Sequence, residues 1–203
     1  MELGLDSLPE AFDKCIEFWH GDQADYRPSC LRVNDTAVDL AYRNYLLWHE
    51  EDKARRIDVS DGMIAEVKRC IDKLNQQRND TIEKLDEEIF RWLTDKNIIA
   101  TSREINSETP GSIVDRLSIL SLKKYHMRED MLRSDISDGH RQRSAQRLEI
   151  LTHQRDDLYE ALKRLFDDYL AGEKVMKLYK QFKMYNDPEL NPELYKHNKP
   201  TSG

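Results

Sequence analysis

A seam of apolar residues between positions 61 and 95 is the feature that most restricts how this chain can fold. Its members recur in alternating steps of three and four, around one polar layer at Gln77 and Arg78: Ile64, Val67, Ile71, Leu74, Ile82, Leu85, Ile89 and Trp92. This spacing places them on one face of a long α-helix, in the manner of a coiled coil. Such a helix must bury its seam against other helices, so the pattern predicts an all-α fold.

Four further helices are expected, and the composition favours them. The 203 residues include only 7 Gly and 6 Pro, and 35% are charged, which is typical of charge-coated helices rather than of a turn-rich β-sandwich. Apolar periodicity and capping signals place these helices near residues 8–20, 35–57, 109–132 and 140–172. We therefore predict an antiparallel bundle of long helices with a coiled-coil-like helical hairpin. It forms one domain over residues 1–185, and residues 186–203 form an irregular or disordered tail.

The net charge and the cysteines bear on partners and compartment. A formal net charge of −7 disfavours nucleic acid and anionic membranes as partners, because neither would attract the chain electrostatically. No apolar run reaches the roughly 18 residues of a membrane span, and the acidic start lacks the features of a signal peptide. Cys15, Cys30 and Cys70 are odd in number and lack metal-ligand spacing, which favours reduced thiols in a cytoplasmic protein. The basic patch from His140 to Arg147 is interpreted as a solvated helix face.

Polar residues interrupt the core-facing stripe near the end of the second predicted helix. At 100° per residue, His49, Asp52 and Arg56 continue the stripe of Tyr45, where apolar residues are expected. Buried charges need partners, and two interpretations remain open. Either Asp52 holds Arg56 in a structural polar layer, or histidine and carboxylate meet a metal, a phosphate or a sugar in a small site.

A second polar insertion lies at the start of the fourth predicted helix, which is apolar on two sides. Asp115 and His126 both point toward its second apolar side. The free N–H groups of the helix start suit an anion, and the nearby donors are Arg103, Thr109, Ser112 and Arg116. A competing hypothesis is that Asp115 crosses the bundle to pair with Arg55, Arg56 or His49. Glu51 and Arg55, four residues apart, are also expected to pair with each other.

Two metalloenzyme patterns match the sequence in part. Glu17 and His20 have the Glu-x-x-His spacing of di-iron bundles, but they fall well off the apolar stripe of their helix and lack a second pair. Helical nucleotide pyrophosphohydrolases hold Mg²⁺ with clustered acids, and a partial version of that cluster is offered by Glu50, Glu51, Asp52 and Asp115. Neither pattern by itself assigns a metalloenzyme.

Residues 44–55 resemble a signature of an uncharacterised bacterial family of helical proteins, DUF4254. The family pattern Asn-x-x-Leu-Trp-His-x-Glu-Asp-x-Ala-Arg is matched by Asn-Tyr-Leu-Leu-Trp-His-Glu-Glu-Asp-Lys-Ala-Arg. The segment from Thr109 to Leu120, with Lys123, resembles the family's other signature. The family has no established activity, but its genes often lie near glycosyltransferases, so the resemblance implies by association a role in envelope glycan assembly. Both signatures coincide with the polar insertions.

These patterns define one candidate site and three hypotheses for its use. The first is a polar-ligand-binding or accessory factor in bacterial surface-glycan metabolism, and the second is a metal-dependent hydrolase of a phosphorylated or nucleotide-linked substrate. The third is a helical interaction scaffold whose seams pair either within one chain or between chains, and pairing between chains would give a homo-oligomer. A divalent metal, where one is bound, is expected to take His49, Asp52 and Asp115 as ligands. The full set of ligand-binding candidates is His49, Glu51, Asp52, Arg55, Arg56, Asp115 and Arg116.

Overall fold

Helices form the body of the protein in the computed structural model, which describes residues 4–21, 33–99, 101–182, 184 and 187–196. They are α1 (Leu8–Trp19), α2 (Asp35–Lys53), α3 (Asp61–Asp95), α4 (Pro110–Leu132), α5 (Asp138–Leu170) and the short α6 (Pro192–Tyr195). Within the described ranges no strand is present; the single β-bridge joins Glu104 to Lys174. The predicted all-α fold is confirmed.

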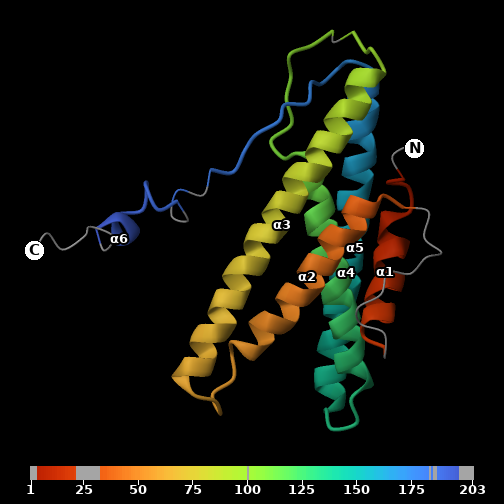
Figure 1. The fold of residues 1–203 in the computed structure, drawn as a ribbon. Coiled ribbons are helices and arrows are strands. Elements are labelled where there is room, and N and C mark those ends of the chain that lie inside the picture. The colour runs from red at the N-terminus through yellow and green to blue at the C-terminus, as the bar shows by residue number, and fades with distance from the viewer. Residues whose placement is uncertain (1–3, 22–32, 100, 183, 185–186, 197–203) are drawn as a thin grey trace, which may run out of the picture.

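Two helical hairpins pack with α1 to form the bundle (Figure 1). The hairpins are α2–α3 and α4–α5, and α4 also contacts α1, α2 and α3, as expected for a helix that is apolar on two sides. In Figure 1 the two hairpins diverge toward the lower end. The chain after α5 first contacts α3, where the Gln181 N–H donates to Glu83, and then extends away from the bundle to α6. Of the predicted tail, residues 186 and 197–203 lie outside the described part of the chain.

The helix ends follow local capping chemistry. The side chains of Ser60 and Thr109 cap α3 and α4 by accepting hydrogen bonds from the backbone N–H three residues later, as their positions predict. The second helix ends at Lys53 rather than near Ile57. Gly172, at φ 73°, lies just beyond the end of α5, because glycine adopts the left-handed conformation that terminates helices.

The main core lies where α4 packs against α1, α2, α3 and α5. The largest of its fully buried side chains come from all of them: Phe12, Ile16, Leu40, Leu85, Ile89, Leu117, Leu122, Leu162 and Phe166. None of the described helices combines the length and the apolarity needed to cross a membrane. Cys15 is a buried free thiol and Cys70 an exposed one, whereas Cys30 lies outside the described residues.

A buried ion cluster joins α1 to the α4–α5 hairpin. One guanidinium nitrogen of Arg155 donates to both carboxylate oxygens of Asp13, at 2.8 Å each. The Lys124 ammonium lies 3.9 Å from the same carboxylate, and its side chain is only 2% exposed. Because burial disfavours an unpaired charge, this cluster fixes how α1 sits against the hairpin. Burial also lowers the pKa of Lys124 from its usual value.

The start of α4 packs unusually close to α3. The Gly111 N–H donates to the buried carboxylate of Asp86 at 2.7 Å. A Cβ atom on Gly111 would lie 2.8 Å from that carboxylate and 2.8 Å from the carbonyl oxygen of Ile82. The Ile82 contact is backbone and cannot rotate away, so only glycine permits this approach of the two helices.

We predict that Gly111→Ala destabilises the protein by about 1–3 kcal/mol, because the added methyl group forces α4 away from α3. Gly62→Ala is the matched control, since the methyl group added to this helical glycine would make only an ordinary van der Waals contact, with Ser60 Oγ at 3.8 Å. The control is expected to stabilise by about 0.5–1 kcal/mol. Urea unfolding measures both changes, and an equal effect of the two substitutions would contradict the close approach.

Candidate functional site

Asp115 forms the centre of a buried polar layer that joins α2, α3 and α4. Arg78 donates two hydrogen bonds to its carboxylate, from Nε to Oδ1 at 2.8 Å and from a terminal nitrogen to Oδ2 at 2.5 Å. Asn44 donates to Asp115 Oδ1 and to Ser118 Oγ, at 2.8 Å each. The predicted pairing of Asp115 with Arg55, Arg56 or His49 is therefore wrong. Its partner is the arginine from the polar layer of the α3 seam.

The arginines of the candidate set lie at the surface. Arg55 pairs with Glu51 at 2.9 Å, as predicted from their spacing, but Arg56 pairs with Asp58 at 2.7 Å. The predicted Asp52–Arg56 layer does not form, and both residues are exposed. The reason is that α2 ends at Lys53, so the helical projection that turned Arg56 inward no longer applies. Arg116 on α4 is likewise exposed and pairs with Glu108 at 2.6 Å.

Three predicted residues do share a cleft. Glu51, Asp52 and Arg55 line a cavity of about 370 Å³ with Asn44 and Arg78. Asp115 is held just behind Arg78, with a side chain that is 5% exposed. The carboxylate of Asp115 is thus committed to protein partners, and the structure does not bring it together with Asp52 or His49 as ligands of one ion.

The anion expected at the start of α4 is supplied by the protein itself. The carboxylate of Asp86 accepts the Gly111 N–H and a hydrogen bond from the side chain of Thr109. This is the place at a helix N-terminus where a bound anion would lie. Burial raises the pKa of Asp86, and these hydrogen bonds counteract the increase.

Three histidines from three helical segments converge near the C-terminal end of α2. His20 follows the end of α1, His49 lies in the last turns of α2, and His126 lies on α4. Each offers one ligand atom, and these atoms all lie within 4.8 Å of one another. Among the described residues, no other group of three or more His, Cys, Asp or Glu side chains converges in this way. The Nε2 atoms of all three are buried and have no hydrogen-bond partner.

The other ring nitrogen is hydrogen-bonded in two of the three histidines. His20 Nδ1 lies 2.8 Å from the carbonyl oxygen of Ile16, which accepts a hydrogen bond from it. His126 Nδ1 lies 2.8 Å from a carboxylate oxygen of Glu129. A proton on Nδ1 leaves the Nε2 lone pair free, and this arrangement of an outer carbonyl or carboxylate is characteristic of metal-ligating histidines.

Aromatic rings hold the three imidazoles in place. Trp48 stacks on His126, with ring centroids 4.8 Å apart and planes inclined by 9°. Tyr125 stacks on His20 at 4.0 Å, and the Tyr45 ring meets His49 edge-on at 4.6 Å. The Tyr45 hydroxyl also donates to the carbonyl oxygen of Trp19, which joins α2 to the residue before His20. These contacts restrict ring rotation and so preorganise the cluster.

The electrostatics favour neutral imidazoles. Burial lowers the pKa of His20, and burial together with the two neighbouring histidines lowers the pKa of His49, from the ordinary value of 6.5. At neutral pH both rings therefore keep an unprotonated nitrogen, which is the form that binds metal.

The donor set fits a divalent transition metal. Three imidazoles are the protein ligands of several catalytic zinc centres, in which a fourth position stays open. Ligand atoms that lie within 4.8 Å of one another could be brought onto one zinc ion by small rotations of the three side chains. Imidazole also suits copper, iron and nickel.

Sequence reasoning selected His49 and noted His126 but missed His20. His20 was discounted because it falls off the apolar stripe of α1, but it lies one residue beyond the helix end, where that stripe no longer decides direction. One signal was present in the sequence. The three clustered histidines directly follow an aromatic residue, in Trp19-His20, Trp48-His49 and Tyr125-His126.

We predict that Asp115→Ala destabilises the protein by about 3 kcal/mol, because it leaves Arg78 and Asn44 without their buried acceptor. Arg116→Ala, at the next position, removes an exposed ion pair and is expected to change stability by no more than about 0.5 kcal/mol. Thermal and urea unfolding of the two variants test this contrast. A small effect of Asp115→Ala would show that the polar layer does not hold the three helices.

Comparison with known proteins identifies the family. The family described as "Protein of unknown function (DUF4254)" matches residues 34–178, a range that includes His49 and His126 and begins after His20. No curated protein matches the chain, and no solved structure does. The matched range covers most of the 203 residues, which confirms the predicted resemblance to this family. The chain belongs to the DUF4254 family.

Proposed function

We propose that this protein is a metal-dependent hydrolase whose metal centre is formed by His20, His49 and His126. The observation that supports it is the convergence of three buried Nε2 atoms that have no hydrogen-bond partner. Leaving a buried polar atom unsatisfied costs about 1–3 kcal/mol, so three such atoms at one point need a common partner. A divalent cation satisfies all three at once.

The chemistry follows from the ligand set. A divalent ion with an open position supplies Lewis acidity, which favours attack of water on an ester or anhydride. In that reaction water gives its hydroxyl group to the phosphoryl or acyl group and its other proton to the leaving oxygen. The part of this chain is to orient the ligands: the Ile16 carbonyl holds His20, and the Glu129 carboxylate holds His126.

This proposal keeps the phosphorylated or nucleotide-linked substrate expected from the sequence and replaces the expected ligands Asp52 and Asp115. A role in surface-glycan metabolism remains part of the proposal, because activated sugars are phosphate esters and anhydrides, the bonds that such a centre hydrolyses. A cytoplasmic location is proposed because an odd number of cysteines, Cys15, Cys30 and Cys70, favours reduced thiols.

The metal centre is tested by zinc binding to the purified protein. We expect one zinc ion per chain, and we expect His20→Ala, His49→Ala and His126→Ala each to weaken binding by more than the roughly 10–100-fold typical of a lost outer-shell partner. His153→Ala, an exposed histidine on α5, is the control. Calorimetry and elemental analysis measure affinity and stoichiometry. Equal binding by the wild type and the three variants would exclude this centre.

A second prediction concerns Glu129, which does not itself bind the ion. Glu129→Gln is expected to weaken zinc binding about 10–100-fold, because the amide no longer supplies a charged acceptor to His126 Nδ1. Glu149→Gln removes an exposed carboxylate on α5 and should have no effect. Unchanged zinc affinity in Glu129→Gln would show that this hydrogen bond does not support the centre.

The hydrolase activity is tested with the zinc-loaded protein and three esters: p-nitrophenyl phosphate, bis(p-nitrophenyl) phosphate and a nucleotide sugar such as UDP-glucose. Turnover that is lost on chelation and in His126→Ala supports the proposal. Stoichiometric zinc binding without turnover of any of the three would argue against a hydrolase and for a structural metal.

A further inference from the structure

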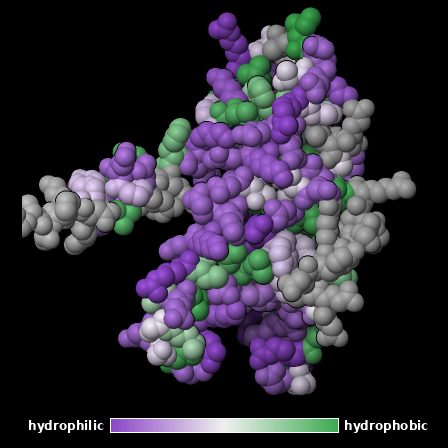
Figure 2. Space-filling view, viewed as in Figure 1, coloured by the Kyte–Doolittle hydropathy of each residue, from purple (hydrophilic) through white to green (hydrophobic). Residues whose placement is uncertain are grey.

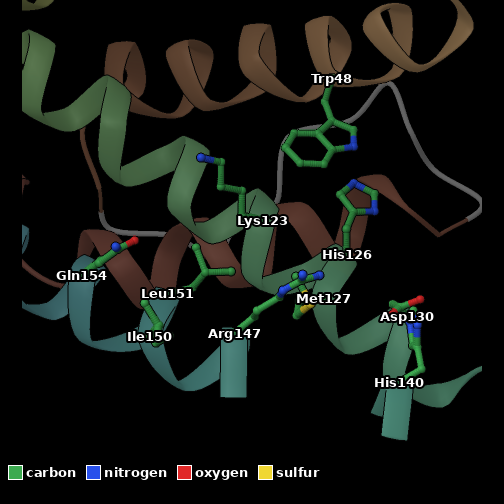
Figure 3. A pocket seen from close by; sticks show the side chains of 10 residues that line it. All are labelled: Trp48, Lys123, His126, Met127, Asp130, His140, Arg147, Ile150, Leu151 and Gln154. Carbon is green, nitrogen blue, oxygen red and sulfur yellow. Dashed lines mark hydrogen bonds and ion pairs between the residues drawn. The ribbon is translucent and has the colours of Figure 1, made fainter. Parts of the chain in front are cut away.

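A cleft of about 620 Å³ lies beside the histidine cluster and is lined mainly by α4 and α5. His126 and the ring stacked on it, Trp48, form part of its wall (Figure 3). The same Trp48 also lines the smaller cleft that contains Glu51 and Asp52. The larger cleft therefore shares His126 with the three-histidine centre.

Much of the cleft surface is apolar, although it is open to solvent. Met127, Ile150 and Leu151 line it together with the indole of Trp48, and Ile150 is 56% exposed. Most of the face seen in Figure 2 is hydrophilic, and its lower end is notched. Apolar side chains gathered in a concave surface of an otherwise polar molecule indicate a binding site for an apolar group.

Two cations complete the lining. Lys123 extends from α4 and Arg147 from α5 (Figure 3), and neither forms an ion pair or hydrogen bond with any residue that the structure describes. The carboxylate in this cleft, Asp130, is already engaged, because it accepts hydrogen bonds from Ser144 and His140 at 2.7 Å each. The cleft thus presents uncompensated positive charge in a chain of net charge −7.

We propose that this cleft binds an organic phosphate, with the phosphate on Arg147 and Lys123 and the apolar body against Trp48, Met127 and Ile150. Arg147 suits the phosphate because a guanidinium forms paired hydrogen bonds with phosphate oxygens. As a substrate site this inference rests on the proposed function, since His126 belongs both to the cleft lining and to the proposed metal centre. Ligand binding itself requires no metal, so the two proposals can fail separately.

Phenyl phosphate is the probe, and its binding to metal-free protein is measured by calorimetry and by tryptophan fluorescence. We expect saturable binding that weakens with added salt and is stronger than that of phenol or inorganic phosphate, each of which has half of the recognised chemistry. Equal binding of inorganic phosphate would overturn the apolar half of the site, and equal binding of phenol would overturn the ionic half.

Substitutions then locate the probe. Arg147→Met and Lys123→Met keep an unbranched, flexible side chain and remove its charge, and each is expected to raise the Kd about tenfold or more. Arg143→Met, one turn away on α5 and outside the cleft lining, is the matched control. All three residues are exposed, so the fold should be kept. A Kd that is unchanged in Arg147→Met and Lys123→Met, or raised equally in Arg143→Met, would overturn the site.

The two proposals are separated by combining this assay with turnover of p-nitrophenyl phosphate by the zinc-loaded protein. Binding of phenyl phosphate that depends on Arg147, without turnover, retains the cleft and rejects the hydrolase. Turnover with a KM that Arg147→Met and Lys123→Met leave unchanged retains the hydrolase and rejects the cleft as its substrate site. Turnover with a raised KM and an unchanged kcat in both variants supports the two together.

Discussion

The carboxylate of Asp115 determines how three helices meet, and the histidine cluster depends on that arrangement. Asp115 lies on α4, its two hydrogen bonds from Arg78 connect it to α3, and its bond from Asn44 connects it to α2. Because a buried charge is stable only with well-placed partners, these helices have one favourable register. Asn44 lies about five residues before His49 on α2, and Asp115 lies three helical turns before His126 on α4. The polar layer therefore sets the separation of His49 and His126, just as the Asp13–Arg155 ion pair places α1 and the histidine that follows it.

The fold was accessible from the sequence because it rests on local signals. The predicted bounds of the third helix, 61–95, agree with α3, and Ser60 and Thr109 act as caps. The polar layer of the α3 seam was also visible, as Gln77 and Arg78. Its partner was not, because helical periodicity gives the direction of a side chain and not the element opposite. Helical periodicity also cannot show at which residue a helix ends. It therefore predicts that Arg56 faces the core, although α2 ends three residues earlier, at Lys53.

The site was only half accessible for a similar reason. His49 was selected because it continues an apolar stripe, and the candidate set around it was filled with neighbours in sequence, Glu51, Asp52 and Arg55. The structure instead joins His49 to His20 and His126, which are remote in sequence. The repeated aromatic–histidine pair has a physical meaning that only the packing reveals. Trp48 and Tyr125 each stack on the histidine of a different pair, so two of the three pairs supply both a ring nitrogen and an aromatic contact to a neighbouring histidine.

The position of His20 has a consequence for assembly. Two of the clustered histidines belong to the segment matched by the family, whereas His20 is contributed by the short helix that precedes it. An ion bound by all three histidines would link α1 to α2 and α4. A chain in which α1 has not yet packed against the bundle would offer only His49 and His126 as ligands. Two imidazoles bind a cation with lower affinity than three. Tight binding of the ion would then require the completely folded chain, so that metal binding would distinguish folded molecules from incompletely folded ones.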